Sequence, residues 1–346
     1  MNSNETSLAS ALIEASAIGD LSTVASLLSQ CADVKEQLPK ALCAAALNGH
    51  AECVNLLILK SSRESCSDAI CVAAKQGHAE CVKLLLPASC PNTENSTALL
   101  TAAENGHAEC VALLIPTSNL RVANFGALRH SVVHGHLECL RALLSVSYSM
   151  ATQNRAMVKA AENGRHECLR LLISTFKPSG NKSAALREAA IFGCHECIAE
   201  LIPVCDMAAL ASEALAAACF TGKAACARLL LPFCSSAEVA SDALPTALRR
   251  GQTECSAILF AASDPLANAP LFLDEALAGD KPASVQQLLA LPGFADLCDL
   301  RGALAKSQAH SLQKASSGAL AAFLERREIG SASAPAQKKS PTAPRL

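Results

Sequence analysis

Histidine and cysteine recur together along this chain at a spacing that could do chemistry. The pentapeptide GHAEC occurs three times, at residues 49–53, 77–81 and 106–110. In each copy the histidine stands three residues before the cysteine, which places both side chains on the same side of a helix. Imidazole and thiolate groups are zinc ligands, and a thiolate at a helix start is a nucleophile. The repetition therefore raises the question of whether the chain repeats a chemical site or a packing unit.

A glycine marks a regular repeat that contains these pairs. It follows an alanine-rich segment, precedes an apolar run, and recurs at intervals of 28 to 30 residues. In the repeat ALLTAAENGHAECVALLIP, residues 98–116, the pattern predicts a first helix over about 98–105, ended by Gly106. A second helix is expected over about 107–115, ended by Pro116. The recurring glycines are Gly19, Gly49, Gly77, Gly106, Gly135, Gly164, Gly193, Gly222, Gly251 and Gly279.

Helices this short cannot bury their apolar faces alone, so the repeats must stack on one another. The sequence therefore predicts an all-α, helix-turn-helix repeat solenoid of about ten repeats. Its consensus, ALxxAAxxGHxECVxLLL, resembles the ankyrin repeat over roughly residues 11–290. Ankyrin repeats have a period of about 33 residues, and the residues missing here fall where that family places its β-hairpin. The resemblance thus implies an ankyrin-like array whose hairpins are short or absent.

Packing explains the recurring cysteines better than a metal or a disulfide does. Equivalent residues of stacked helices lie ~8–10 Å apart, whereas a disulfide needs Cα atoms within ~4.4–6.8 Å of each other. A His–Cys pair supplies only half of a structural zinc site, and Lys223 and Gln252 replace the histidine in later repeats. We therefore expect no metal site, and histidines that bond to neighbouring backbone. The cysteines expected to pack as small apolar residues are Cys53, Cys81, Cys110, Cys139, Cys168, Cys197, Cys226 and Cys255.

Cys194 stands apart because the run GCHEC places it at a helix start, three residues before Cys197. That setting lowers the pKa of a thiol, so a cysteine-based redox- or metal-responsive protein is the alternative function. A tolerated surface cysteine is the simpler interpretation. The chain has no second C-x-x-C and no G-x-G-x-x-G, H-E-x-x-H or G-x-S-x-G motif. We therefore predict a protein that is not an enzyme and has no cofactor.

Composition narrows the class of partner. The formal net charge of −2 gives no electrostatic reason to bind nucleic acid or an acidic membrane. No uncharged run reaches the ~18 residues of a membrane span, and the first residues lack the features of a signal peptide. Eighteen cysteines fit a reducing compartment. We expect a cytoplasmic monomer, either resident or delivered into another cell as an effector, whose partner is another protein.

Two segments are expected along the chain. Residues 1–328 should form one continuous ankyrin-like solenoid, in which the terminal repeats are degenerate because they act as caps. Residues 296–328 should add an irregular helix pair at its end. Residues 329–346 are rich in Pro, Ser and Ala and carry basic residues, so they should form a disordered tail.

The partner-binding face is predicted from the positions that vary most between repeats. These lie six, five, two and one residues before each repeat glycine, whereas alanine dominates four and three residues before it. A helix places the variable positions on one side, opposite the alanines, and in the resembling family that side lines the concave surface. Large apolar residues rimmed by arginines are typical of an interaction hot spot, although a contact with the next repeat is the alternative explanation. The predicted residues are Arg129, His130, Val133, His134, Arg187, Glu188, Ile191, Phe192, Phe220, Arg249 and Arg250.

Overall fold

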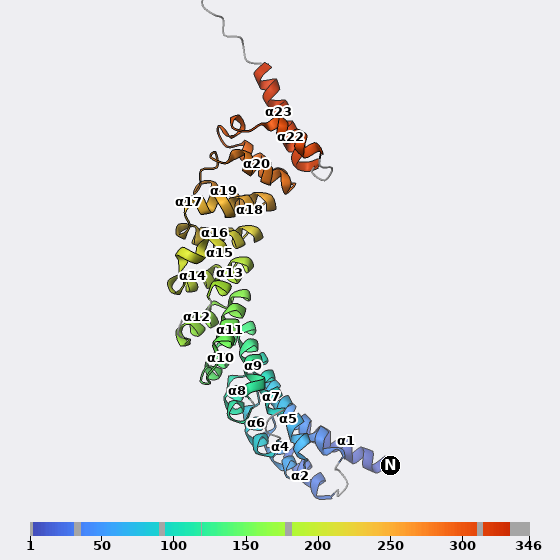
Figure 1. Cartoon of the computed structure of the whole chain (residues 1–346). Coiled ribbons are helices and arrows are strands. Elements are labelled where there is room, and N and C mark those ends of the chain that lie inside the picture. Colours follow the sequence, from blue (N-terminus) through green and yellow to red (C-terminus); the bar gives the residue numbers. More distant parts are fainter. Residues whose placement is uncertain are drawn as a thin grey trace, which may run out of the picture. The chain divides into compact units, whose positions relative to one another are not determined.

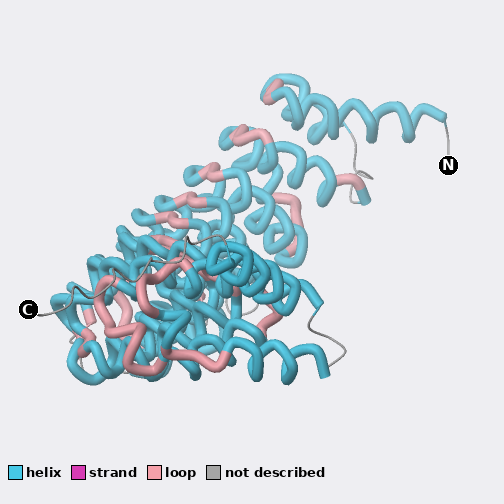
Figure 2. Tube along the Cα trace, turned by 90° about the horizontal axis from the view of Figure 1, so that it is seen from above, coloured by secondary structure: helices cyan, strands magenta, loops and turns pink. Residues whose placement is uncertain are grey.

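Helices account for the regular structure of the chain in a computed structural model that describes residues 3–30, 36–89, 94–118, 120–176, 182–309 and 314–332. No strand occurs within these ranges, which confirms the all-α class (Figure 1). Short loops join the helices (Figure 2). The chain divides into two compact units, Met1–Ala185 and Leu186–Leu346, and each is described on its own. That residues 1–328 form one continuous array stays a prediction.

The first unit consists of helix pairs in which first helices pack on first helices and second helices on second helices. Figure 1 shows these as two rows. The first helices are α1 (Ser3–Ile18), α3 (Leu38–Leu47), α5 (Arg63–Gln76), α7 (Glu94–Asn105), α9 (Leu120–His134) and α11 (Met150–Glu162). The second helices are α2 (Leu21–Gln30), α4 (Ala51–Ile58), α6 (Ala79–Leu85), α8 (Ala108–Leu114), α10 (Leu137–Leu143) and α12 (His166–Thr175).

The second unit continues the same alternation. Its first helices are α13 (Lys182–Phe192), which begins at the end of the first unit, α15 (Met207–Thr221), α18 (Leu244–Arg250), α20 (Ala269–Ala278) and α22 (Leu300–Ala309). Its second helices are α14 (His195–Leu201), α16 (Ala224–Leu230), α19 (Thr253–Phe260), α21 (Pro282–Leu289) and α23 (Lys314–Ala332). A short helix, α17 (Ser236–Glu238), and a π-helical segment, Val239–Ala243, lead into α18.

A proline turn replaces the hairpin in four repeats. Each second helix there runs into a 3₁₀ turn with proline at its second position, because proline has no N–H with which to continue the α-helical ladder. The next first helix follows almost at once, and α7 begins at Glu94 rather than at the expected Ala98. Where no hairpin forms, a longer helix satisfies the backbone hydrogen bonds. The turns are Leu86–Ala88, Ile115–Thr117, Ile202–Val204 and Leu231–Phe233, around Pro87, Pro116, Pro203 and Pro232.

Glycine and histidine from neighbouring repeats interlock at the helix junctions. Gly49 has φ +78°, as expected for a glycine that ends a helix, and His78 of the next repeat lies against it. The His78 Nε2 donates a hydrogen bond of 3.0 Å to the carbonyl of Leu47. His50, His107 and His136 make the equivalent bond, and Arg165 makes it with its Nε. The expectation that these histidines bond to neighbouring backbone is therefore confirmed.

This interlock predicts a non-additive pair of substitutions. Gly49→Ala should cost ~2 kcal/mol of unfolding free energy, because a left-handed conformation costs an alanine ~1–2 kcal/mol and its Cβ would lie 2.5 Å from Nδ1 of His78. His78→Ala should cost ~1 kcal/mol through the lost hydrogen bond. In the double variant the collision disappears, so only the backbone strain and the lost hydrogen bond contribute, and the cost should fall below the sum of the two single variants. Urea unfolding of all four proteins measures this, and additive costs would show that the two residues do not interlock.

The ends of the array differ from its interior. Asp20 replaces the first histidine, and its carboxylate accepts from the Thr23 N–H at 3.1 Å and from the hydroxyls of Thr23 and Ser22. These hydrogen bonds, chiefly that from the Thr23 side chain, lower the pKa of Asp20 to about 2. At the other end, α22 and α23 confirm the additional helix pair.

Two expectations near the C-terminus need correction. Helix α23 continues to Ala332, into the predicted tail, because no proline occurs before Pro335 to end it; residues 333–346 lie outside the described residues. Gly279 is not left-handed. Its φ is −78°, and Asp280 takes the positive φ of 51° in its place.

None of the helices in the described part of the chain has the length and apolar character needed to cross a membrane.

Candidate partner-binding face

The eight recurring cysteines are buried on the second helices, each with at most 1% of its surface exposed. Burial raises the pKa of four of their thiols, those of Cys81, Cys110, Cys139 and Cys226, to about 11. All eight are free thiols. The prediction that these residues are buried as small apolar side chains is confirmed, and at neutral pH these four remain protonated and unreactive.

Removing one such thiol tests the packing account. Cys110→Ala should cost ~1 kcal/mol of unfolding free energy through a small void. Cys110→Ser should cost ~2 kcal/mol of unfolding free energy, because a hydroxyl would then be buried without a hydrogen-bond partner. Chemical denaturation of both variants decides the order, and a serine variant as stable as the wild type would contradict packing as the reason for this cysteine.

Cys194 is not a surface residue, contrary to the simpler interpretation of its sequence. Only 8% of it is exposed, and it is the N-terminal cap of α14. Its sulfur accepts a hydrogen bond of 3.3 Å from the N–H of Cys197 and lies 3.8 Å from a carboxylate oxygen of Glu196. The thiol caps the helix much as a serine hydroxyl would.

In the first unit, the predicted face on α9 is polar and internally bonded. The guanidinium of Arg129 donates to Nε2 of His130 at 3.0 Å, and the ring of His130 stacks on that of His134 with centroids 6.1 Å apart. Burial, followed by the charge of Arg129, lowers the pKa of His130. Val133 is half-buried, and its carbonyl accepts the hydrogen bond from Arg165. Three of the four predicted residues therefore form a cluster of two rings and one cation, and the fourth, Val133, takes part through its backbone.

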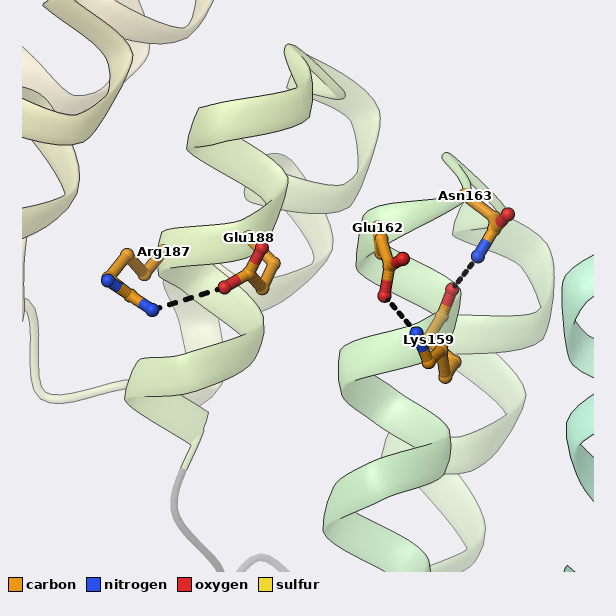
Figure 3. Close-up of polar contacts among 5 residues, drawn as sticks. All are labelled: Lys159, Glu162, Asn163, Arg187 and Glu188. Carbon is orange, nitrogen blue, oxygen red and sulfur yellow. Dashed lines mark hydrogen bonds and ion pairs between the residues drawn. The ribbon is translucent and has the colours of Figure 1, made fainter. Parts of the chain in front are cut away.

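Figure 3 shows that the residues at the equivalent positions of α11 bond to one another. Lys159 and Glu162 form an ion pair of 2.6 Å, and the side chain of Asn163 donates to the carbonyl of Lys159 at 2.8 Å. At these three positions the repeat therefore presents polar groups that bond to one another.

In the second unit, the predicted residues on α13 include one ion pair and one exposed ring. Arg187 and Glu188 lie 3.3 Å apart, and their side chains point toward each other in Figure 3. Ile191 is half-buried, whereas Phe192 is 52% exposed. An exposed phenylalanine at this position fits the prediction of an unpartnered apolar residue on the face.

Phe220, Arg249 and Arg250 come together around a pocket. The guanidinium of Arg250 lies 3.7 Å from the ring centroid of Phe220, which is still 47% exposed, and Arg249 makes a two-pronged ion pair with Glu275. The pocket has a volume of about 640 Å³ and contains residues that the sequence prediction missed. It is lined by Phe220, Thr246, Arg249, Arg250, Gln252, Gly279 and Lys281.

Two of the pocket residues that the prediction missed, Gln252 and Lys281, could have been found from their place in the repeat. Gln252 stands directly after its repeat glycine, where earlier repeats have histidine, and Lys281 takes the corresponding place over Gly251. Side chains at that position lie across the preceding repeat, so they reach its face. A second group that the prediction did not weigh together is Glu104, His130 and His134, whose ligand atoms lie within 4.8 Å of one another. Its signal was the spacing of four residues between the two histidines, which places both on one side of α9.

Comparison with known proteins relates part of the chain to a repeat family. Residues 12–95 and 70–154 match the family model of ankyrin repeats in three copies, which confirms the resemblance to ankyrin repeats over residues 12–154. No curated protein matches the sequence. Among solved structures, the ankyrin repeat domain of human ASB11 is similar, with 21% identity over 47% of this chain and 82% of that one, and a TM-score of 0.40.

Proposed function

We propose that this chain is a non-catalytic scaffold that binds a partner protein through the exposed face of its first helices. Ankyrin repeats are generally protein-interaction modules, and repeat arrays place specificity in the positions where repeats differ. The observation that carries the proposal is Phe220, half-exposed beside an arginine-lined pocket on the predicted face. Aromatic and arginine side chains are the residues most enriched at interaction hot spots.

The charges around the pocket indicate the chemistry of the partner. Arg249, Arg250 and Lys281 line it, and Glu275 is paired with only the first of these. The local excess of positive charge favours a partner segment that carries carboxylates next to an apolar side chain. The low net charge of the whole chain makes nucleic acid a poor alternative.

Capture of partners by the intact chain, followed by mass spectrometry, identifies candidates for this proposal. Each candidate is then titrated against the wild type and against Arg250→Ala, in 50 mM and 300 mM salt. A partner of the face should lose affinity in the variant and in high salt, because both weaken attraction to the cations. Candidates that bind both proteins equally at both salt concentrations would contradict the proposed face.

The cysteine-based alternative has a separate test. Thiol titration of the native, reduced chain should give few fast-reacting groups, because the recurring cysteines are buried and four have a pKa near 11. Rapid reaction of several thiols before unfolding would favour the redox-responsive protein over the scaffold.

A further inference from the structure

Glu104, His130 and His134 come from two packed helices of the first unit. Glu104 lies in the last turn of α7, and the two histidines lie one turn apart on α9, which packs against α7. One ligand atom from each comes within 4.8 Å of the other two. Donors bound to one zinc at ~2.0–2.2 Å are ~3.3–3.5 Å apart in a tetrahedron, so small side-chain rotations would bring all three onto one ion.

We propose that these three side chains bind a divalent transition metal ion, with zinc as the fitting example. Two imidazoles and one carboxylate are a donor set that zinc, nickel and cobalt accept, and calcium and magnesium do not favour. Three protein ligands leave a further coordination position to water or to a side chain of another molecule. This inference does not rest on the proposed function, because it concerns binding of an ion by the chain alone.

Arg129 reveals the protonation of one ring nitrogen of His130, Nε2. A guanidinium can only donate, so its contact of 3.0 Å to Nε2 of His130 requires that this nitrogen present a lone pair. A lone pair on imidazole nitrogen is what a metal binds. Arg129 therefore donates to a nitrogen lone pair that a metal could bind, and it places a positive charge beside the cluster. It is a competitor of the metal.

His136, which directly precedes α10, contacts two members of the cluster, Glu104 and His134. Its Nε2 donates a hydrogen bond of 2.9 Å to the backbone carbonyl of Glu104, and its ring stacks on His134 with centroids 5.8 Å apart. These two contacts restrain the backbone of one ligand and the ring of another. Within the residues that the structure describes, no other group of three such side chains approaches as closely.

Calorimetric titration of the untagged, reduced full chain with zinc tests the site. We expect one bound ion per chain, and at least a tenfold loss of affinity in His134→Ala and in Glu104→Gln, since even supporting residues of metal sites contribute about 10- to 100-fold. Both residues are exposed, so the variants should fold as the wild type does. The matched control is His195→Ala, an exposed histidine that lies 3.3 Å from Glu196 without a third ligand. It should bind zinc normally.

Two further measurements separate this site from the thiols. Arg129→Ala should raise zinc affinity, because the competing donor and its charge are removed. Cobalt bound to the chain should show no thiolate charge-transfer absorption. The proposal is overturned if zinc does not bind saturably, if His134→Ala and Glu104→Gln bind it as the wild type does, or if the bound cobalt carries thiolate ligands.

Discussion

Replacing Gly279 with alanine is expected to destabilise the Leu186–Leu346 unit by ~3 kcal/mol or more, the upper end of the cost of overpacking. Gly279 has an ordinary φ of −78°, so its backbone does not require glycine. An added Cβ would instead collide with the backbone carbonyl group of Arg249 in the preceding repeat. A backbone obstacle cannot rotate away as a side chain can, so the two repeats would have to separate.

Two other glycines of the same unit are matched controls for this substitution. Gly293 has φ +77° and no atom near its Cβ position, so Gly293→Ala should show strain alone, about 1–2 kcal/mol. Gly318 lies inside α23 with open space around it, so Gly318→Ala should stabilise the unit by up to ~1 kcal/mol. Thermal and urea unfolding of the three variants give the order. A Gly279→Ala variant as stable as the wild type would show that Arg249 does not lie against it.

The same glycine shows what the sequence could and could not establish. The spacing of 28 to 30 residues predicted the helix pairs and their stacking, because periodicity and helix ends are local properties of the chain. It could not distinguish a glycine needed for its φ, such as Gly49, from one needed for space, such as Gly279. Only the packing of the next repeat decides that.

For the candidate face too, the sequence predicted which side of each helix is exposed but not the contacts between repeats. The register of the first helices placed Phe192 and Phe220 on an exposed side, and both are about half-exposed. The pairing of Phe220 with Arg250, and the pocket that Lys281 completes, depend on side chains reaching across from the next repeats. Such contacts join residues about one or two repeats apart, and helix periodicity carries no information about them.

Phe220→Ala and Phe192→Ala are each expected to lower affinity for a partner of the face by ~2 kcal/mol or more, about 30-fold in Kd. Each ring is the large apolar side chain at its position on the face, and truncating it removes the surface a partner would bury. The contact of Phe220 with Arg250 bears out part of the alternative explanation, an intramolecular contact with the next repeat. That contact leaves 47% of Phe220 exposed and available to a partner.

The matched control is Phe233→Ala, because Phe233 is 41% exposed but lies in the proline turn after α16, outside the predicted face and the pocket. It should bind the partner with wild-type affinity. All three variants should unfold within ~1 kcal/mol of the wild type, as substitutions of half-exposed side chains lose little buried surface. Calorimetry with a captured partner and parallel unfolding curves measure both quantities. Normal binding by Phe192→Ala and Phe220→Ala, or equal losses in Phe233→Ala, would place the binding surface elsewhere, and large losses of stability would place the two rings in the core.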